Sequence, residues 1–61
     1  MKRQDLVRHL RAQRCRLLRE GRGHSVRVNP ASGRQSAVPR HREIGEYTAR
    51  AICRQLGILE P

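Results

Sequence analysis

The sequence predicts an α+β fold: one two-layer α-β-β-β-α domain over residues 1–61, in which two helices cover one face of a three-stranded antiparallel sheet. Two apolar stripes with helical spacing, one near each end of the chain, predict the helices. Between them, residues that alternate in polarity are separated by glycine-containing turns, which predicts strands. Placing both helices on one face of the sheet is the simplest way to bury both stripes.

The first half of the chain is expected to hold a helix and two strands. Residues 3–14 form a helical pattern, and the apolar face consists of Leu6, Val7 and Leu10. No Ser, Thr, Asn or Asp stands just ahead of this segment, so its N-terminal cap is weak. The run 15–19 fits a strand or a continuation of the helix, and the glycines after it favour the strand. Residues 25–29 alternate with a period of two, as a half-buried strand does.

The second half is expected to complete a hairpin and add a helix. Residues 29–33 contain Asn, Pro, Ser and Gly, which are the residues of tight turns. A third strand over 35–38 should end at Pro39, because proline cannot donate a hydrogen bond to a neighbouring strand.

The final helix follows the charged connector 40–43 and runs from Gly45 or Glu46 to Leu56, with Gly57 as its cap. The residues of its apolar face are Ala49, Ile52, Cys53 and Leu56. Beyond the cap, Ile58 and Leu59 are expected to fold back onto the helix.

The charge of the chain indicates a polyanionic partner. Fourteen basic residues stand against five acidic ones, which gives a net charge of +9, and all the basic residues except Lys2 are arginines. A GC-rich genome would also favour arginine, because arginine codons are rich in G and C. A small protein with this much positive charge attracts polyanions whatever the origin of the charge. No segment approaches the roughly 20 apolar residues of a membrane-spanning helix, and Met1 is not followed by a signal peptide. We therefore expect a cytoplasmic protein with no membrane partner.

The two cysteines, Cys15 and Cys53, stand far apart and lack the spacing of a zinc site. A disulfide is improbable in the cytoplasm. We expect both thiols to be small buried side chains, and we expect neither a metal nor a cofactor.

His24 is the residue best placed for chemistry. It follows the flexible turn Gly21-Arg22-Gly23 and stands at the start of a predicted strand. Its imidazole can take up or release a proton near neutral pH. The alternation puts His24 in phase with Val26 and Val28, toward the core side, unless a turn or bulge aims it elsewhere. We expect it at the rim of the sheet with its tip in solvent.

Five segments carry a resemblance to a known family. They are Lys-Arg-x-Asp-Leu-x-Arg-x-Leu at 2–10, Leu-Leu-Arg-Glu-Gly at 17–21, His-Ser-Val-x-Val-Asn-Pro at 24–30, Ser-Ala-Val-Pro-Arg-His-Arg-Glu-Ile at 36–44 and Ala-Arg-x-Ile-Cys-x-x-Leu-Gly-Ile at 49–58. With these segments in order over almost its whole length, the chain resembles HicA-type toxins, the RNA-cleaving halves of bacterial and archaeal toxin–antitoxin pairs.

The resemblance implies a double-stranded-RNA-binding-domain-like fold and places the family's catalytic histidine at His24. It implies mRNA cleavage that needs neither a metal nor the ribosome. The partner would be a HicB-type antitoxin that covers the active site, and operator DNA would be bound only indirectly, through that antitoxin. The sequence departs from the common family pattern at Gly23, directly before the histidine, and at Arg27, in the region where many relatives have an aromatic residue.

Several further side chains are candidates for contact with RNA. RNA supplies its own nucleophile, the 2′-hydroxyl, so cleavage needs proton transfer by His24 and cations that hold the phosphate. Arg22 and Arg27 are the nearest cations in sequence, and Arg40 and His41 follow the third strand. His41 could contact phosphate or merely satisfy backbone groups.

Two other readings of the chain stay open. A non-catalytic double-stranded-RNA or ribosome-binding module would explain the charge and the fold, but it would leave His24 without a role. A DNA-binding regulator is a weaker alternative, because no helix-turn-helix spacing is visible. His9, between Arg8 and Arg11, is expected to be solvent-exposed on a polar helix face.

Overall fold

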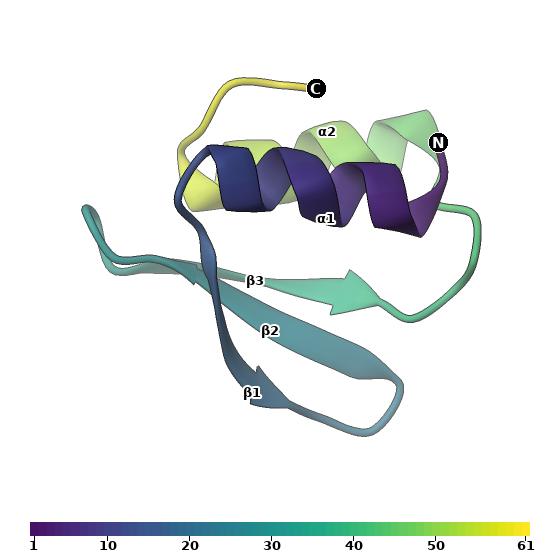
Figure 1. Cartoon of the computed structure of the whole chain (residues 1–61), viewed down its shortest axis with the longest axis horizontal. Coiled ribbons are helices and arrows are strands. Elements are labelled where there is room, and N and C mark those ends of the chain that lie inside the picture. The colour runs from purple at the N-terminus through teal and green to yellow at the C-terminus, as the bar shows by residue number, and fades with distance from the viewer.

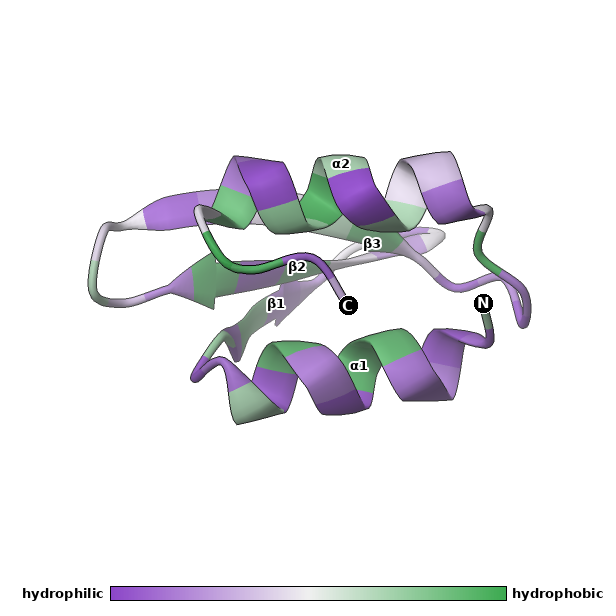
Figure 2. Ribbon diagram, turned by 90° about the horizontal axis from the view of Figure 1, so that it is seen from above, coloured by the Kyte–Doolittle hydropathy of each residue, from purple (hydrophilic) through white to green (hydrophobic).

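The computed structural model describes all 61 residues and has the element order expected from the sequence (Figure 1). The elements are α1 (Arg3–Ala12), β1 (Arg16–Glu20), β2 (His24–Asn29), β3 (Arg34–Pro39) and α2 (Glu46–Leu56). The strands form an antiparallel sheet in the order β1-β2-β3. Figures 1 and 2 show both helices on the same side of this sheet. The predicted α+β fold, with two helices on one face of three antiparallel strands, is therefore confirmed.

Helix α1 ends two residues earlier than the sequence pattern indicates. Arg14 adopts a left-handed backbone conformation with φ of 66°, which stops the helix and turns the chain toward β1. The N–H of Cys15 then donates to the carbonyl of Leu10 at 2.9 Å, which closes the helix end. At the other end, Lys2 makes no side-chain cap, as expected.

Helix α2 begins and ends where the sequence places it. Gly57 takes the left-handed conformation of a C-terminal cap, with φ of 70°, and the N–H of Ile58 donates to the carbonyl of Cys53 at 3.0 Å. Ile58 packs against the core as predicted.

The chain end beyond Ile58 corrects two expectations. The side chain of Leu59 is 74% exposed and does not fold back onto the helix. Its carbonyl oxygen instead lies 2.7 Å from Nε2 of His9. This contact leaves His9 half-buried, so the prediction of a solvent-exposed histidine on α1 is wrong.

The core lies between the helices and the sheet. Its nine buried residues come from both helices, β3 and the connecting segments: Leu6, Leu10, Cys15, Val38, Ile44, Ala49, Ile52, Cys53 and Leu56. Both cysteines are free and buried, as expected, and burial raises the pKa of each thiol. Neither helix has the length and apolar composition that a bilayer crossing requires.

The face of β2 that covers the core is polar, which the sequence does not reveal. Ser25 is 2% exposed and pairs with the buried Val38 of β3, so residues in phase with Ser25 face the helices. His24, Val26 and Val28 therefore lie on the opposite, uncovered face of the sheet, which we call the open face. The expectation that the valines mark the core side is wrong, because hydrogen bonds to α1 and α2 occupy the helix side of this strand.

Candidate functional site

The turn before His24 needs both of its glycines. Gly23 has φ of +78°, a conformation that side chains with a Cβ rarely adopt. The N–H of Gly21 donates to the carbonyl of His24 at 2.8 Å. A Cβ on Gly21 would stand 3.3 Å from that same oxygen, which is a tight contact. The glycines thus allow the two strands to close around the turn immediately before the histidine.

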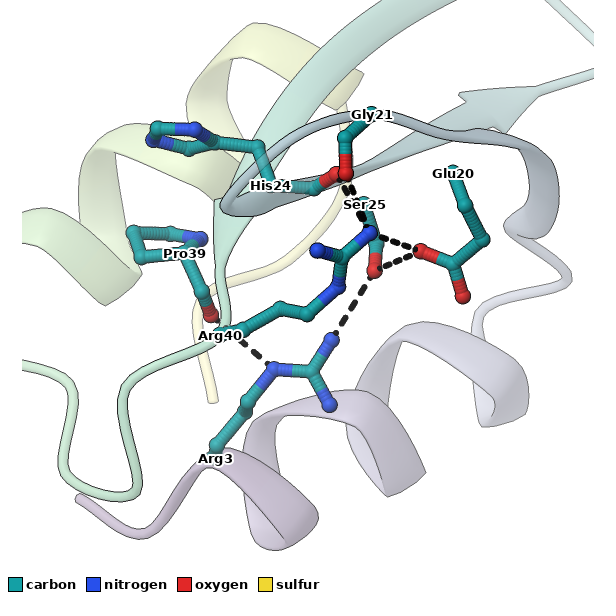
Figure 3. Close-up of polar contacts among 7 residues, drawn as sticks. All are labelled: Arg3, Glu20, Gly21, His24, Ser25, Pro39 and Arg40. Atoms are coloured by element: carbon teal, nitrogen blue, oxygen red, sulfur yellow. Dashed lines mark hydrogen bonds and ion pairs between the residues drawn. The ribbon is translucent and has the colours of Figure 1, made fainter.

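The guanidinium of Arg40 holds this turn from the end of β3 (Figure 3). It donates to the carbonyl oxygens of Gly21 and His24, the latter at 3.1 Å, and to the carboxylate of Glu20 at 2.8 Å. The backbone N–H of Arg40 also donates to the carbonyl of Gly23 at 3.2 Å. The main chain on both sides of the turn is therefore fixed by one residue.

A second guanidinium reaches the same place from α1. Nε of Arg3 donates to the carbonyl of Pro39 at 2.9 Å, and Nη2 donates to Oγ of Ser25 at 3.1 Å. The hydroxyl of Ser25 in turn donates to the carboxylate of Glu20 (Figure 3). Arg3, Glu20, Ser25 and Arg40, which we call the turn network, join α1 and all three strands beneath His24.

Glu20 is the anion that connects the two guanidinium groups of the turn network. The hydrogen bond from Ser25 lowers the pKa of its carboxyl group, and the hydrogen bond from Arg40 lowers it further. Both donors favour the ionised form. The carboxylate is therefore the form in which the network is complete.

The lowered pKa of Glu20 predicts a pH dependence of folding. A carboxyl group whose pKa is lower in the folded protein stabilises the fold above its unfolded pKa, and loses that contribution as pH falls through the folded value. We expect Glu20→Gln to lower the melting temperature at pH 7 and to have little effect at pH 2. Thermal unfolding followed by circular dichroism at both pH values checks this. An equal loss at both would show that the charge of Glu20 is irrelevant.

His24 itself stands on the open face at the first position of β2. Its side chain is exposed, as expected, and its partner across the ladder is Pro39. Figure 3 shows the imidazole projecting away from the turn network, on the side of the Pro39 ring. The network therefore contacts the main chain of His24 and leaves its ring free for another molecule.

The structure brings only some of the predicted cations to His24. Arg22 is exposed at the tip of the turn, and His41 is exposed in the connector two residues beyond Pro39. Arg40 contacts the carbonyl of His24 rather than projecting beside its ring. Arg27 is three positions from His24 on the same strand and so lies on the opposite face of the sheet.

Arg19 shares the open face with His24, although no pattern in the sequence indicates this. It is exposed and pairs with Val26, which is in phase with His24. A β-bulge between Leu17 and Arg19 shifts the register by one residue. Because a regular strand would have put Arg19 on the same side as Leu17, alternation alone places this arginine on the wrong face.

The turn network was also missed at the level of sequence. Glu20 and Ser25 lie five positions apart, and Arg3 is far from both, so only the fold brings them together. The one available signal was Glu20, which stands beside the turn and is one of only five acidic residues in the chain. No cluster of three or more His, Cys, Asp or Glu side chains is arranged to hold a metal ion.

One family model matches the chain, that of the HicA toxin of bacterial toxin–antitoxin systems, over residues 3–58. The chain belongs to the HicA toxin family. No curated protein and no solved structure matches it. The HicA match includes His24, its turn and every residue of the turn network, so the site described above lies inside the family domain.

Proposed function

We propose that this HicA-family chain is an endoribonuclease that cleaves mRNA without a metal ion and without the ribosome, and that His24 transfers the proton. The observation that carries the proposal is that the His24 imidazole is exposed while the backbone around it is held in place. The guanidinium of Arg40 donates to the carbonyl of His24, and that of Arg3 donates to the carbonyl of Pro39 on the neighbouring strand. Family membership supports the toxin role. General acid–base catalysis requires a side chain that can exchange a proton with the substrate and that is attached to a fixed backbone.

The chemistry needs few groups from the protein. The 2′-hydroxyl of RNA attacks the adjacent phosphorus, a base accepts the hydroxyl proton, and an acid protonates the departing 5′-oxygen. An imidazole can serve in either role near neutral pH. Because Arg40 and the Gly21 N–H fix the carbonyl of His24, the ring is attached to a rigid segment of the sheet. A rigid attachment lowers the entropic cost of aligning the ring with a bound strand.

Cations near the open face would hold the reacting phosphate. Arg19 and Arg22 are exposed, and the structure gives neither a side-chain hydrogen bond nor an ion pair. We assign them the phosphate contacts closest to His24, because arginine binds phosphate oxygens in a bidentate manner. Arg40 is already engaged with Glu20 and two carbonyls, so we assign it the positioning of His24 rather than contact with RNA.

The partner in this proposal is a HicB-type antitoxin that covers the open face. Val26 and Val28 lie there half-buried, with no helix over them. Covering the open face would shield this apolar surface and block His24 in one step. Operator DNA would be contacted by the antitoxin and only indirectly by this chain.

Incubation of the purified protein with end-labelled RNA in excess EDTA tests the proposed activity. We expect discrete cleavage products, and we expect an added HicB-type antitoxin to suppress them. RNA binding without cleavage would contradict the proposal and would favour a non-catalytic double-stranded-RNA or ribosome-binding module.

A further inference from the structure

A second cluster of arginines lies away from His24. The cluster surrounds the segment that joins α1 to β1, whose course can be followed in Figure 1. Here the surface forms a hollow of about 340 Å³, and we call it the arginine hollow. It is lined by Arg11, Arg14, Cys15, Arg16, Leu17 and Arg27. Arg27 is in phase with the buried Ser25, so the hollow opens on the helix side of the sheet. It is thus a site distinct from the open face.

Arg27 has no partner within the protein. Its Nε atom is buried without a hydrogen-bond acceptor, and none of the six ion pairs of the chain includes it. Burial lowers the pKa of Arg27, and repulsion from Arg11 and Arg3 lowers it further. A buried N–H donor without an acceptor destabilises the folded protein, and a neutral apolar side chain of similar size would not carry this cost.

The backbone is strained at the same place. Arg14 is the only residue other than glycine with a positive φ, at 66°. The left-handed conformation is unfavourable for a residue with a Cβ. Here it brings a further guanidinium-bearing side chain to the edge of the hollow. Local strain beside a guanidinium that makes no ion pair is a feature of binding sites, where a ligand can supply the missing anion.

The charge continues beyond the hollow along α1. Arg11 also lines a larger hollow of about 820 Å³, whose other basic side chains are Lys2, Arg3, Arg8 and Arg42. Glu43 is the single acidic residue that lines it. The two hollows therefore form one positive track joined at Arg11. Such a track matches a polymer that carries a negative charge at every repeat, as the backbone of a nucleic acid does.

We propose that the arginine hollow is a phosphate site, which takes a backbone phosphate of single-stranded RNA remote from the bond that is cut. Arg27 and Arg11 donate to the phosphate oxygens, and the strand continues along α1. The ligand class is a phosphodiester. The proposal rests on the proposed function in one respect, namely that the RNA bound here is the substrate that the protein cleaves. Inorganic phosphate is the smallest probe of the same chemistry.

The test separates binding from cleavage. A fluorescent 2′-O-methyl RNA oligonucleotide lacks the attacking hydroxyl, so its affinity can be measured by anisotropy whether or not the protein is a nuclease. Arg27→Met is compared with wild type across a salt series, and Arg54→Met is the matched control. Arg54 is an arginine of α2 that already pairs with Glu60 at 3.5 Å.

We expect Arg27→Met to weaken oligonucleotide binding at least fivefold and to reduce the slope of log affinity against log salt by about 0.7, the value for one phosphate on a single strand. Arg54→Met should change the affinity less than twofold. Without RNA, Arg27→Met should melt at a higher temperature than wild type, because it removes a buried N–H donor that has no acceptor and a charge that Arg11 and Arg3 repel. Phosphate should raise the melting temperature of wild type more than that of the variant.

Unchanged oligonucleotide affinity and salt slope in Arg27→Met would overturn the proposal. The proposal would also be overturned if oligoglutamate bound wild type as tightly as the oligonucleotide does and if Arg27→Met weakened the binding of both equally. The hollow would then select an acidic protein segment. If Arg27→Met does not fold, the exposed Arg11→Gln replaces it, with the same expected loss of affinity and slope. Loss of cleavage alone bears on His24 and not on this site.

Discussion

Replacement of His24 by alanine is expected to slow RNA cleavage about 10²–10⁴-fold, the range for loss of one positioned acid or base. The fold should persist, because the imidazole is exposed and the turn network contacts only the main chain at this position. Alanine keeps that main chain and its hydrogen bonds. Single-turnover rates on labelled RNA measure the loss, and circular dichroism measures the fold.

The matched control for this variant is His9→Gln. His9 lies on α1, and its ring contacts the carbonyl of Leu59, so the substitution removes a histidine far from the open face and keeps a side chain that can hydrogen-bond. We expect its cleavage rate to stay close to wild type. Co-purification of His24→Ala with the antitoxin would show that the inhibitor surface is intact. A cleavage rate in His24→Ala equal to wild type, with contaminating nuclease excluded, would remove His24 from the mechanism.

Replacement of Leu10 by alanine is expected to remove about 2–5 kcal/mol from the free energy of unfolding. Leu10 is fully buried in the core, and its carbonyl also accepts the hydrogen bond that ends α1. A chain of this length has a total stability of only about 3–9 kcal/mol, so the variant should lose a large share of it and unfold at a much lower urea concentration than wild type. The cost is high because the nine-residue core has little capacity to repack around a cavity.

Urea denaturation of Leu10→Ala beside Leu59→Ala measures this effect against a leucine of the same size outside the core. Leu59 is 74% exposed, and its loss should change the free energy of unfolding by no more than about 0.5 kcal/mol. Equal midpoints for the two variants would show that Leu10 does not belong to the cooperative core.

The elements of the fold could be predicted because their signals are local. The stripe of α2 is regular, and Gly57 marks its end with the conformation that the sequence predicts. The turn at 29–33 contains the residues that such turns require. The sequence pattern predicts a first helix that is two residues too long. The arginine-rich run contains no residue that indicates the left-handed conformation of Arg14, a conformation in which glycine is the usual residue.

The orientation of β2 could not be predicted, because alternation gives the phase of a strand but not the face that is covered. Val26 and Val28 are the apolar residues of this strand, yet Ser25 is the one that faces the helices. Tertiary hydrogen bonds decide this: Ser25 meets Arg3, and the amide of Asn29 donates to the carbonyl of Leu56 at 2.8 Å. Such partners, far apart in sequence, leave no periodic signal.

The exposed position of His24 after its glycine turn could be predicted from the sequence, whereas the side chains around it could not. The glycine turn and the family resemblance both single out His24. The cations near it depend on register, and the bulge in β1 moves Arg19 to the open face while Arg27 stays on the helix side. Proximity in sequence therefore suggested Arg27 as a neighbour of His24, whereas the pleat of the strand separates them.

The chemical identity of the RNA ends after cleavage tests the central claim most directly. Attack by the 2′-hydroxyl, with His24 moving the proton, predicts fragments that end in a 2′,3′-cyclic phosphate or its hydrolysis product and begin with a 5′-hydroxyl, formed equally well in EDTA. A 2′-deoxy substitution at the cut position should abolish cleavage there. Fragments with a 3′-hydroxyl and a 5′-phosphate, or undiminished cutting at the 2′-deoxy position, would contradict the account.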